Sequence, residues 1–158
     1  MTMIDKERMS LILTEAAQRL DVDGLLAIDE RDAWFIAFNE DTEIDVELDA
    51  SGHRVTFQCA LGRPDDARRD HLCRTLLQYN YLWRETGGMR MALDGADGDV
   101  VQIFDMPSES VDAESVQNVV GNFAQAASAW REVLSSGGDI PNPASPTMSG
   151  LPPGAIRG

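Results

Sequence analysis

The chain has 158 residues, 43% of them hydrophobic and 25% charged, which is typical of one globular domain able to bury a core. Acidic residues outnumber basic ones by 27 to 13, and the net charge at pH 7 is −14. Such a surface repels phosphate backbones and anionic lipids, so we expect neither nucleic acid nor membrane among the partners. Because the first ten residues are rich in charge and no apolar run is long enough to span a bilayer, we expect a cytoplasmic protein.

The first predicted element is a helix over residues 3–20, where no proline or glycine interrupts the pattern. Met9 and Leu13 fall on one face, as in a helix that packs on a core. Ile4 and Leu11 point to nearly the opposite side of the helix. These two outward apolar side chains are therefore candidates for contact with a partner.

Three strands of an antiparallel meander are predicted next, over residues 33–38, 43–49 and 54–61. The first strand is apolar on both faces, and alternation alone does not say which face meets the core. One of the two faces carries Trp34, Ile36 and Phe38. This face is a second candidate for partner contact.

The strand over residues 43–49 alternates strictly, with apolar side chains inward and carboxylates outward. Its outward row consists of Glu43, Asp45, Glu47 and Asp49. The row has two interpretations, an acidic groove or a solvated strand face. We favour the solvated face, because rows of charge on a half-buried strand usually point to water.

A second helix is predicted to open at Pro64 and to close at the glycine pair 87–88. It has two apolar stripes, about 120° apart around the helix axis. The first stripe contains Leu72, Leu76, Tyr79 and Trp83, the second contains Cys73, Leu77 and Tyr81, and Asn80 lies between them. A single sheet offers this helix only one face to pack on, so the second stripe indicates a subunit interface or a ligand groove. We favour the interface, formed by Cys73, Leu77, Asn80 and Tyr81 across a two-fold axis.

The rest of the domain is predicted as a hairpin around residues 94–99 and a third helix from Asp112 to about residue 134. Residues 135–158 are rich in Gly, Pro and Ser and are expected to form a flexible tail. Residues 1–134 therefore form an α+β domain, in the order helix, three strands, helix, two strands, helix, with an antiparallel sheet packed with helices.

No arrangement of residues typical of catalysis or metal binding is evident in the sequence. The chain has two histidines and two cysteines, and His71 and Cys73 lie about 200° apart on a helix, so they cannot grip one metal ion. The "DGADGD" stretch fits a hairpin turn better than a calcium loop, since Ala and Gly occupy the alternate ligand positions. We therefore expect no metal, no cofactor and no enzymatic activity.

Two stretches carry a resemblance to a known family: "LLQYNYLWRETGGMRMALD" (76–94) and "FAQAASAWREVL" (123–134). With the order of elements and the acidity, the chain resembles class I type III secretion chaperones of the Tir chaperone (CesT) family over residues 5–134. The resemblance implies a homodimer that binds the N-terminal segment of a secreted effector without ATP and keeps it soluble. It further implies that the segment is held extended, adding a strand to an open sheet edge, and that the secretion ATPase is a further candidate partner.

On this resemblance, the expected effector-binding residues are the outward apolar ones, Ile4, Leu11, Trp34, Ile36 and Phe38. The alternative is a dimeric regulatory or structural protein of the same fold whose partner is not an effector.

Overall fold

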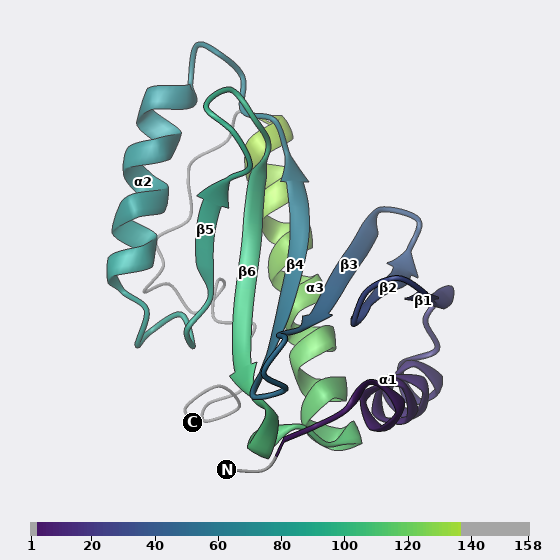
Figure 1. The fold of residues 1–158 in the computed structure, drawn as a ribbon. Coiled ribbons are helices and arrows are strands. Elements are labelled where there is room, and N and C mark those ends of the chain that lie inside the picture. The colour runs from purple at the N-terminus through teal and green to yellow at the C-terminus, as the bar shows by residue number, and fades with distance from the viewer. Residues whose placement is uncertain (1–2, 137–158) are drawn as a thin grey trace.

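The computed structural model describes residues 3–136, and the tail predicted for residues 135–158 lies outside them from residue 137 onward. The described part contains three α-helices, six strands and a short 3-10 turn (Figure 1). In chain order these are α1 (Lys6–Leu20), β1 (Gly24–Ile28), β2 (Ala33–Asn39), β3 (Thr42–Leu48), β4 (Arg54–Gly62), α2 (Arg69–Tyr81), β5 (Arg90–Leu93), β6 (Val100–Pro107), η1 (Ser108–Ser110) and α3 (Ala113–Ser136). The predicted α+β class and element order are confirmed, with one strand added.

The added strand is β1, at the edge of a single antiparallel sheet ordered β1-β2-β3-β4-β6-β5. Its five residues, GLLAI, do not alternate between apolar and polar positions, so periodicity gives no strand signal. The turn before it is made by Asp21, which ends α1 in the left-handed conformation at φ 54°. β1 pairs with β2 alone in the described chain, and β5 forms the opposite edge.

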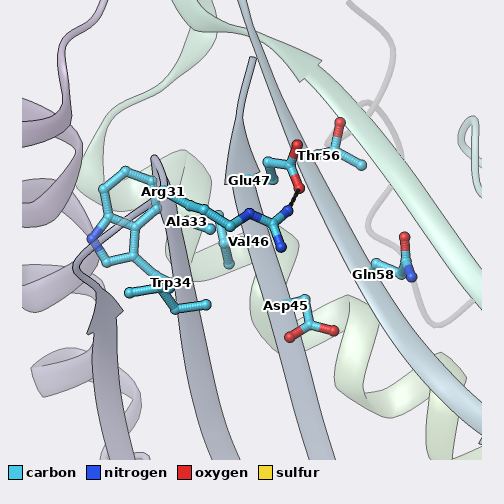
Figure 2. A pocket seen from close by; sticks show the side chains of 9 residues that line it. Arg31, Ala33, Trp34, Asp45, Val46, Glu47, Thr56 and Gln58 are labelled. Atoms are coloured by element: carbon cyan, nitrogen blue, oxygen red, sulfur yellow. Dashed lines mark hydrogen bonds and ion pairs between the residues drawn. The ribbon is translucent and has the colours of Figure 1, made fainter. Parts of the chain in front are cut away.

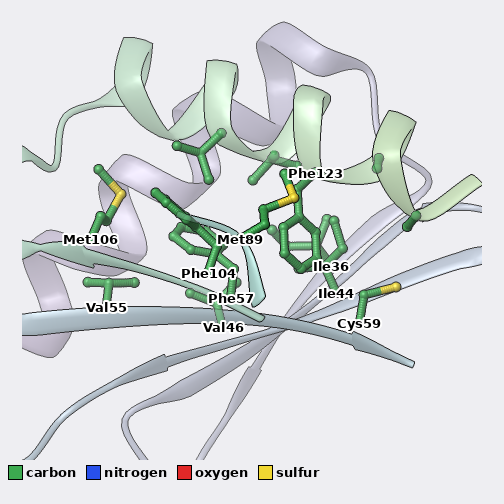
Figure 3. Close-up of a cluster of buried hydrophobic side chains, with 14 of the residues drawn as sticks. Ile36, Ile44, Val46, Val55, Phe57, Cys59, Met89, Phe104, Met106 and Phe123 are labelled. Atoms are coloured by element: carbon green, nitrogen blue, oxygen red, sulfur yellow. The ribbon is translucent and has the colours of Figure 1, made fainter. Parts of the chain in front are cut away.

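The core lies between the sheet and the two helices that cover one of its faces, α1 and α3 (Figures 1 and 3). A cross-strand row of large side chains lines this inner face of the sheet: Trp34, Val46, Phe57 and Phe104. From α3, Phe123 and Trp130 pack onto them and are fully buried. Burial of side chains of this size contributes about 1.5–3 kcal/mol each, which is why this face dominates the stability of the domain.

The inner face of β2 is the one that carries Trp34 and Ile36, which are 1% and 2% exposed. The indole nitrogen of Trp34 donates a 2.9 Å hydrogen bond to Oγ of Ser10 in α1. The expectation that these two side chains are free to meet a partner is therefore wrong. Phe38, near the end of the strand, is half-buried against the same core, and the other face of β2 carries Phe35.

Ile4 is also buried, contrary to the helical phase assigned to it. It precedes α1, whose N-cap is Asp5, so its direction is not set by the helix. Its backbone N–H donates a 3.1 Å hydrogen bond to the carbonyl of Gly52, in the turn between β3 and β4. Gly52 has φ +70°, and a Cβ there would lie 2.8 Å from the Ile4 carbonyl oxygen, so this turn requires glycine. The segment before α1 is thus fixed to the sheet.

α2 is shorter than predicted, because it begins at Arg69 and ends at Tyr81. Leu72, Leu76 and Tyr79 of its first stripe are buried, and the Tyr79 ring meets Trp130 edge-on at 5.2 Å between centroids. Burial raises the pKa of the Tyr79 hydroxyl to about 12. Trp83 lies beyond the helix end and is exposed, so its assignment to the core stripe is wrong.

Candidate protein-binding surfaces

The two edges of the sheet differ in whether they are covered. At the β5 edge, the side chain of Asn80 in α2 binds the backbone of Met91 twice, donating to its carbonyl at 2.9 Å and accepting from its N–H at 2.8 Å. The amide thereby takes the place of a neighbouring strand, and α2 packs alongside β5 (Figure 1). The β1 edge has no such cover among the described residues, and an edge strand leaves half of its N–H and C=O groups unpaired. β1 is the edge available for a further strand.

Beside the open edge, α1 and the start of β1 enclose a groove of about 370 Å³. Thr14, Ala17 and Gln18 of α1 line one side, and Val22 and Leu25 line the other. The lining combines aliphatic side chains with the hydroxyl of Thr14, the amide of Gln18 and the carboxylate of Asp21. A groove of this composition suits side chains of an extended peptide better than a charged small molecule.

Two exposed leucines flank this region. Leu11 is 72% exposed and lies within about 20° of Gln18 around the axis of α1, on the side that forms the groove. Leu26 in β1 is 65% exposed. Single exposed leucines are common on proteins, but these two lie on either side of the open strand edge. Leu11 is on the α1 side and Leu26 is on the opposite face of the sheet, so a strand added to β1 can contact both.

The far end of β1 is fixed by Lys6, the single lysine of the chain. Its ammonium group donates to the carbonyls of Ile28 at 3.0 Å and Arg31 at 2.7 Å, in the β1–β2 connection. The open edge is therefore anchored to α1. Its position is already fixed in the unbound chain, so a partner does not have to order it on binding.

Of the five predicted effector-binding residues, only Leu11 is exposed on the surface. Phe38 is half-buried, and Ile4, Trp34 and Ile36 belong to the core. Leu26 is the residue that the sequence analysis missed. The run of apolar residues after Gly24 was the available signal, since four apolar residues between a helix and a turn are compatible with a strand.

The outward side of α2 carries a second apolar surface. Leu77 and Tyr81 are 69% and 84% exposed, and Cys73 is partly exposed. Trp83 joins them after the end of the helix, with the guanidinium of Arg84 5.1 Å from its ring centre. Asn80, predicted to lie in the same interface, uses its amide within the chain on Met91.

The described residues bring together no group of three metal-ligating side chains. Cys59 is buried, and Arg131 donates to its sulfur at 3.2 Å and to the Thr42 hydroxyl at 2.8 Å. Burial raises the pKa of the Cys59 thiol, and Arg131 lowers it by a smaller amount. This cluster joins α3 to β3 and β4, which is a structural role. No helix within residues 3–136 has the length and apolar character needed to cross a bilayer.

The model of the Tir chaperone protein (CesT) family matches residues 11–131. The fold is also similar to chains of three solved complexes. For the ExsC–ExsE complex the TM-score is 0.70 at 18% identity, over 84% of this chain and 97% of that chain. For the HopA1–SchA chaperone–effector complex it is 0.63 at 16% identity, over 82% and 98%. For the Yersinia pestis type III secretion chaperone SycH in complex with a stable fragment of YscM2 it is 0.57 at 15% identity, over 80% and 98%. A search of curated proteins found no match.

Proposed function

The chain belongs to the Tir chaperone (CesT) family, and on that premise we propose that it is a type III secretion chaperone for an effector. The similar structures include a complex described as chaperone and effector, and one described as a type III secretion chaperone with a bound fragment. In this proposal, the chain binds the N-terminal segment of its effector in extended form and keeps it soluble until secretion.

The observation that carries the proposal is the open β1 edge beside the α1 groove, flanked by Leu11 and Leu26. A strand added to β1 gains main-chain hydrogen bonds that do not depend on sequence, while every second side chain can enter the groove. Burial of the two leucines adds about 25 cal/mol per Å² of apolar area. These contributions act through binding alone, so the proposed mechanism needs no ATP.

The outward surface of α2 supports a homodimer as part of this function. Leu77, Tyr81 and Cys73 lie on one side of a helix whose other side is packed on the domain. Contact with the same surface of a second copy buries all of them at once, because a two-fold interface is self-complementary. The dimer offers two β1 edges to a single client. The secretion ATPase remains a further candidate partner, on the family resemblance alone.

The experiment is co-expression of the full chain with proteins encoded beside it, followed by affinity purification and mass spectrometry. We expect one partner to co-purify with the chain. A shortened form of that partner, which keeps only the N-terminal segment, should still co-purify. Recovery of a folded regulatory partner, bound through a domain other than its N-terminal segment, would instead support the alternative of a regulatory protein with this fold.

A further inference from the structure

The face of the sheet opposite the helices carries an apolar strip at the β1 edge. Leu26 of β1 lies opposite Phe35 of β2, and Ile28 lies opposite Ala33, with all four on this outer face. Leu26 is exposed, Phe35 and Ile28 are half-buried, and Ala33 is buried. α1 and α3 pack on the other face, so in the described chain this strip is open (Figure 1).

The same cross-strand row changes from apolar to acidic as it passes from β2 to β3. Phe35 lies opposite Asp45, and Asp45 lies opposite Gln58 of β4. Figure 2 shows the hollow at this point, about 420 Å³ in volume, where the guanidinium of Arg31 binds Glu47 at 2.8 Å. A second hollow of about 510 Å³ shares Asp45 and is lined further by Phe35, by Arg131 and by four more carboxylates, Glu40, Asp41, Glu43 and Asp99. Apolar groups, carboxylates and two arginines therefore line two hollows that meet at Asp45.

The carboxylates of this surface outnumber its two arginines, and Arg131 donates to Thr42 and Cys59 and, in the described chain, forms no ion pair with a carboxylate. Glu43, Asp45 and Glu47 lie at alternate positions of β3, about 6.7 Å apart along the strand. Within residues 3–136, Arg31 pairs with Glu47, whereas Glu43 and Asp45 form no ion pair. Partial burial and the charge of Glu43 raise the pKa of Asp45, although Arg31 opposes the shift. A cation beside Asp45 relieves the repulsion between Asp45 and Glu43. A ligand that supplies this cation can also place an apolar group on the nearby strip.

We infer that this outer face binds a client segment in which apolar side chains are followed by arginine or lysine. The apolar side chains of the client contact Leu26, Ile28 and Phe35. Its basic side chains lie between the carboxylates of Glu43, Asp45 and Glu47. Neighbouring strands are about 4.8 Å apart, so the apolar and basic side chains must be separated by roughly 10 Å, or about three extended residues. The inference rests on the proposed function, because it assigns a further part of the same unfolded client to a second surface.

The test uses the full chain and a synthetic peptide with leucine at alternate positions of its first half and arginine at alternate positions of its second half. Binding is measured by fluorescence anisotropy of a dye on the peptide. The sheet-face variant is Asp45→Asn with Glu43→Gln, and its matched control is Glu114→Gln with Glu132→Gln, which removes two exposed charges from α3. A second peptide carries citrulline, a neutral isostere, in place of arginine.

We expect the sheet-face variant and the citrulline peptide each to weaken binding tenfold or more, while the α3 variant changes it less than twofold. Equal affinity for both variants, or for both peptides, overturns the inference. Leu11→Asp separates this site from the proposed function, because Leu11 lies on α1, on the helix side of the sheet, and the substitution leaves the outer sheet face intact. If the wild-type chain binds the peptide through the sheet face but captures no natural client on co-expression, the chaperone function fails and the basic-segment site stands.

Discussion

Asn80 and Met91 join α2 to the edge of the sheet through two hydrogen bonds, one donated and one accepted by the same side-chain amide. This relationship explains why one edge of the sheet is closed and the other open. It also sets the orientation of α2, because the helix that covers β5 then directs Leu77 and Tyr81 away from the domain. The two proposed interfaces, for a client and for a second copy, are thereby separated onto opposite ends of the sheet.

Asn80→Ala tests this connection. The substitution leaves the N–H and carbonyl of Met91 without their partner, and we expect the free energy of unfolding to fall by about 1–3 kcal/mol. Urea denaturation followed by circular dichroism measures the change. Gln78→Ala, at an exposed position of the same helix, is the control and should stay within about 0.5 kcal/mol of the wild type. An Asn80→Ala chain as stable as its control contradicts the role given to the amide.

Leu77→Asp and Tyr81→Asp test the dimer. A carboxylate buried without a partner at an apolar interface costs several kcal/mol, so we expect each variant to be monomeric. Light scattering at micromolar concentration should give about twice 17.3 kDa for the wild type and about 17.3 kDa for the variants. His71→Asp, exposed on another side of α2, should remain dimeric. A wild-type chain that is monomeric at this concentration rules the interface out.

Leu11→Asp and Leu26→Asp test the client surface. Both side chains are largely exposed, so we expect the melting temperature to change by no more than a degree or two. Affinity for the captured client should fall tenfold or more, about 1.4 kcal/mol, for each. Arg8→Asp, at the opposite end of α1 from the groove, serves as the control and should bind normally. A large fall in the melting temperature of Leu11→Asp would show that Leu11 supports the fold. Unchanged client affinity in both variants would show that the client binds elsewhere.

Asp45→Asn tests whether the negative charge of Asp45 lowers the stability of the folded chain. Burial and the charge of Glu43 raise the pKa of Asp45 in the folded state, so ionisation of this carboxyl opposes folding at neutral pH. The uncharged amide removes that opposition, and we expect a higher melting temperature than that of the wild type at pH 7. The gain should shrink as pH falls through the folded pKa and vanish below the unfolded pKa, where the carboxyl is protonated in both states. A variant less stable than the wild type at pH 7 contradicts this sign.

Periodicity predicted the elements that have one clear apolar face. α3 is an example: Asp112 caps it as expected, with its carboxylate accepting from the Ser115 N–H at 2.7 Å, and its stripe from Val116 to Trp130 is buried. β3 alternates as predicted, and β4, also predicted as a strand, alternates between buried and less buried positions in the same way. In these elements, local pattern and tertiary packing require the same residues in the same places.

The failures lie where the chain departs from one regular period. Ile4 was assigned a helical direction, but it precedes the N-cap and is fixed by Gly52, a contact 48 positions away in sequence that no local pattern contains. Trp83 falls just beyond the end of α2. β2 is apolar on both faces, and only its pairing with β3 decides that Trp34 points inward. For the candidate site, Leu11 was predictable from helical phase, whereas Leu26 required knowledge that β1 is a strand.

The claim that β1 is the edge that receives the client can be tested by amide hydrogen exchange of the chain with and without its captured client. The measurement compares two edges of one sheet in the same sample, so β5 serves as an internal control. We predict that amides of residues 24–28 in β1 exchange at least tenfold more slowly in the complex, while those of residues 90–93 in β5 do not change. Unchanged exchange in β1, with protection appearing in β5 or only in α2, would contradict the claim.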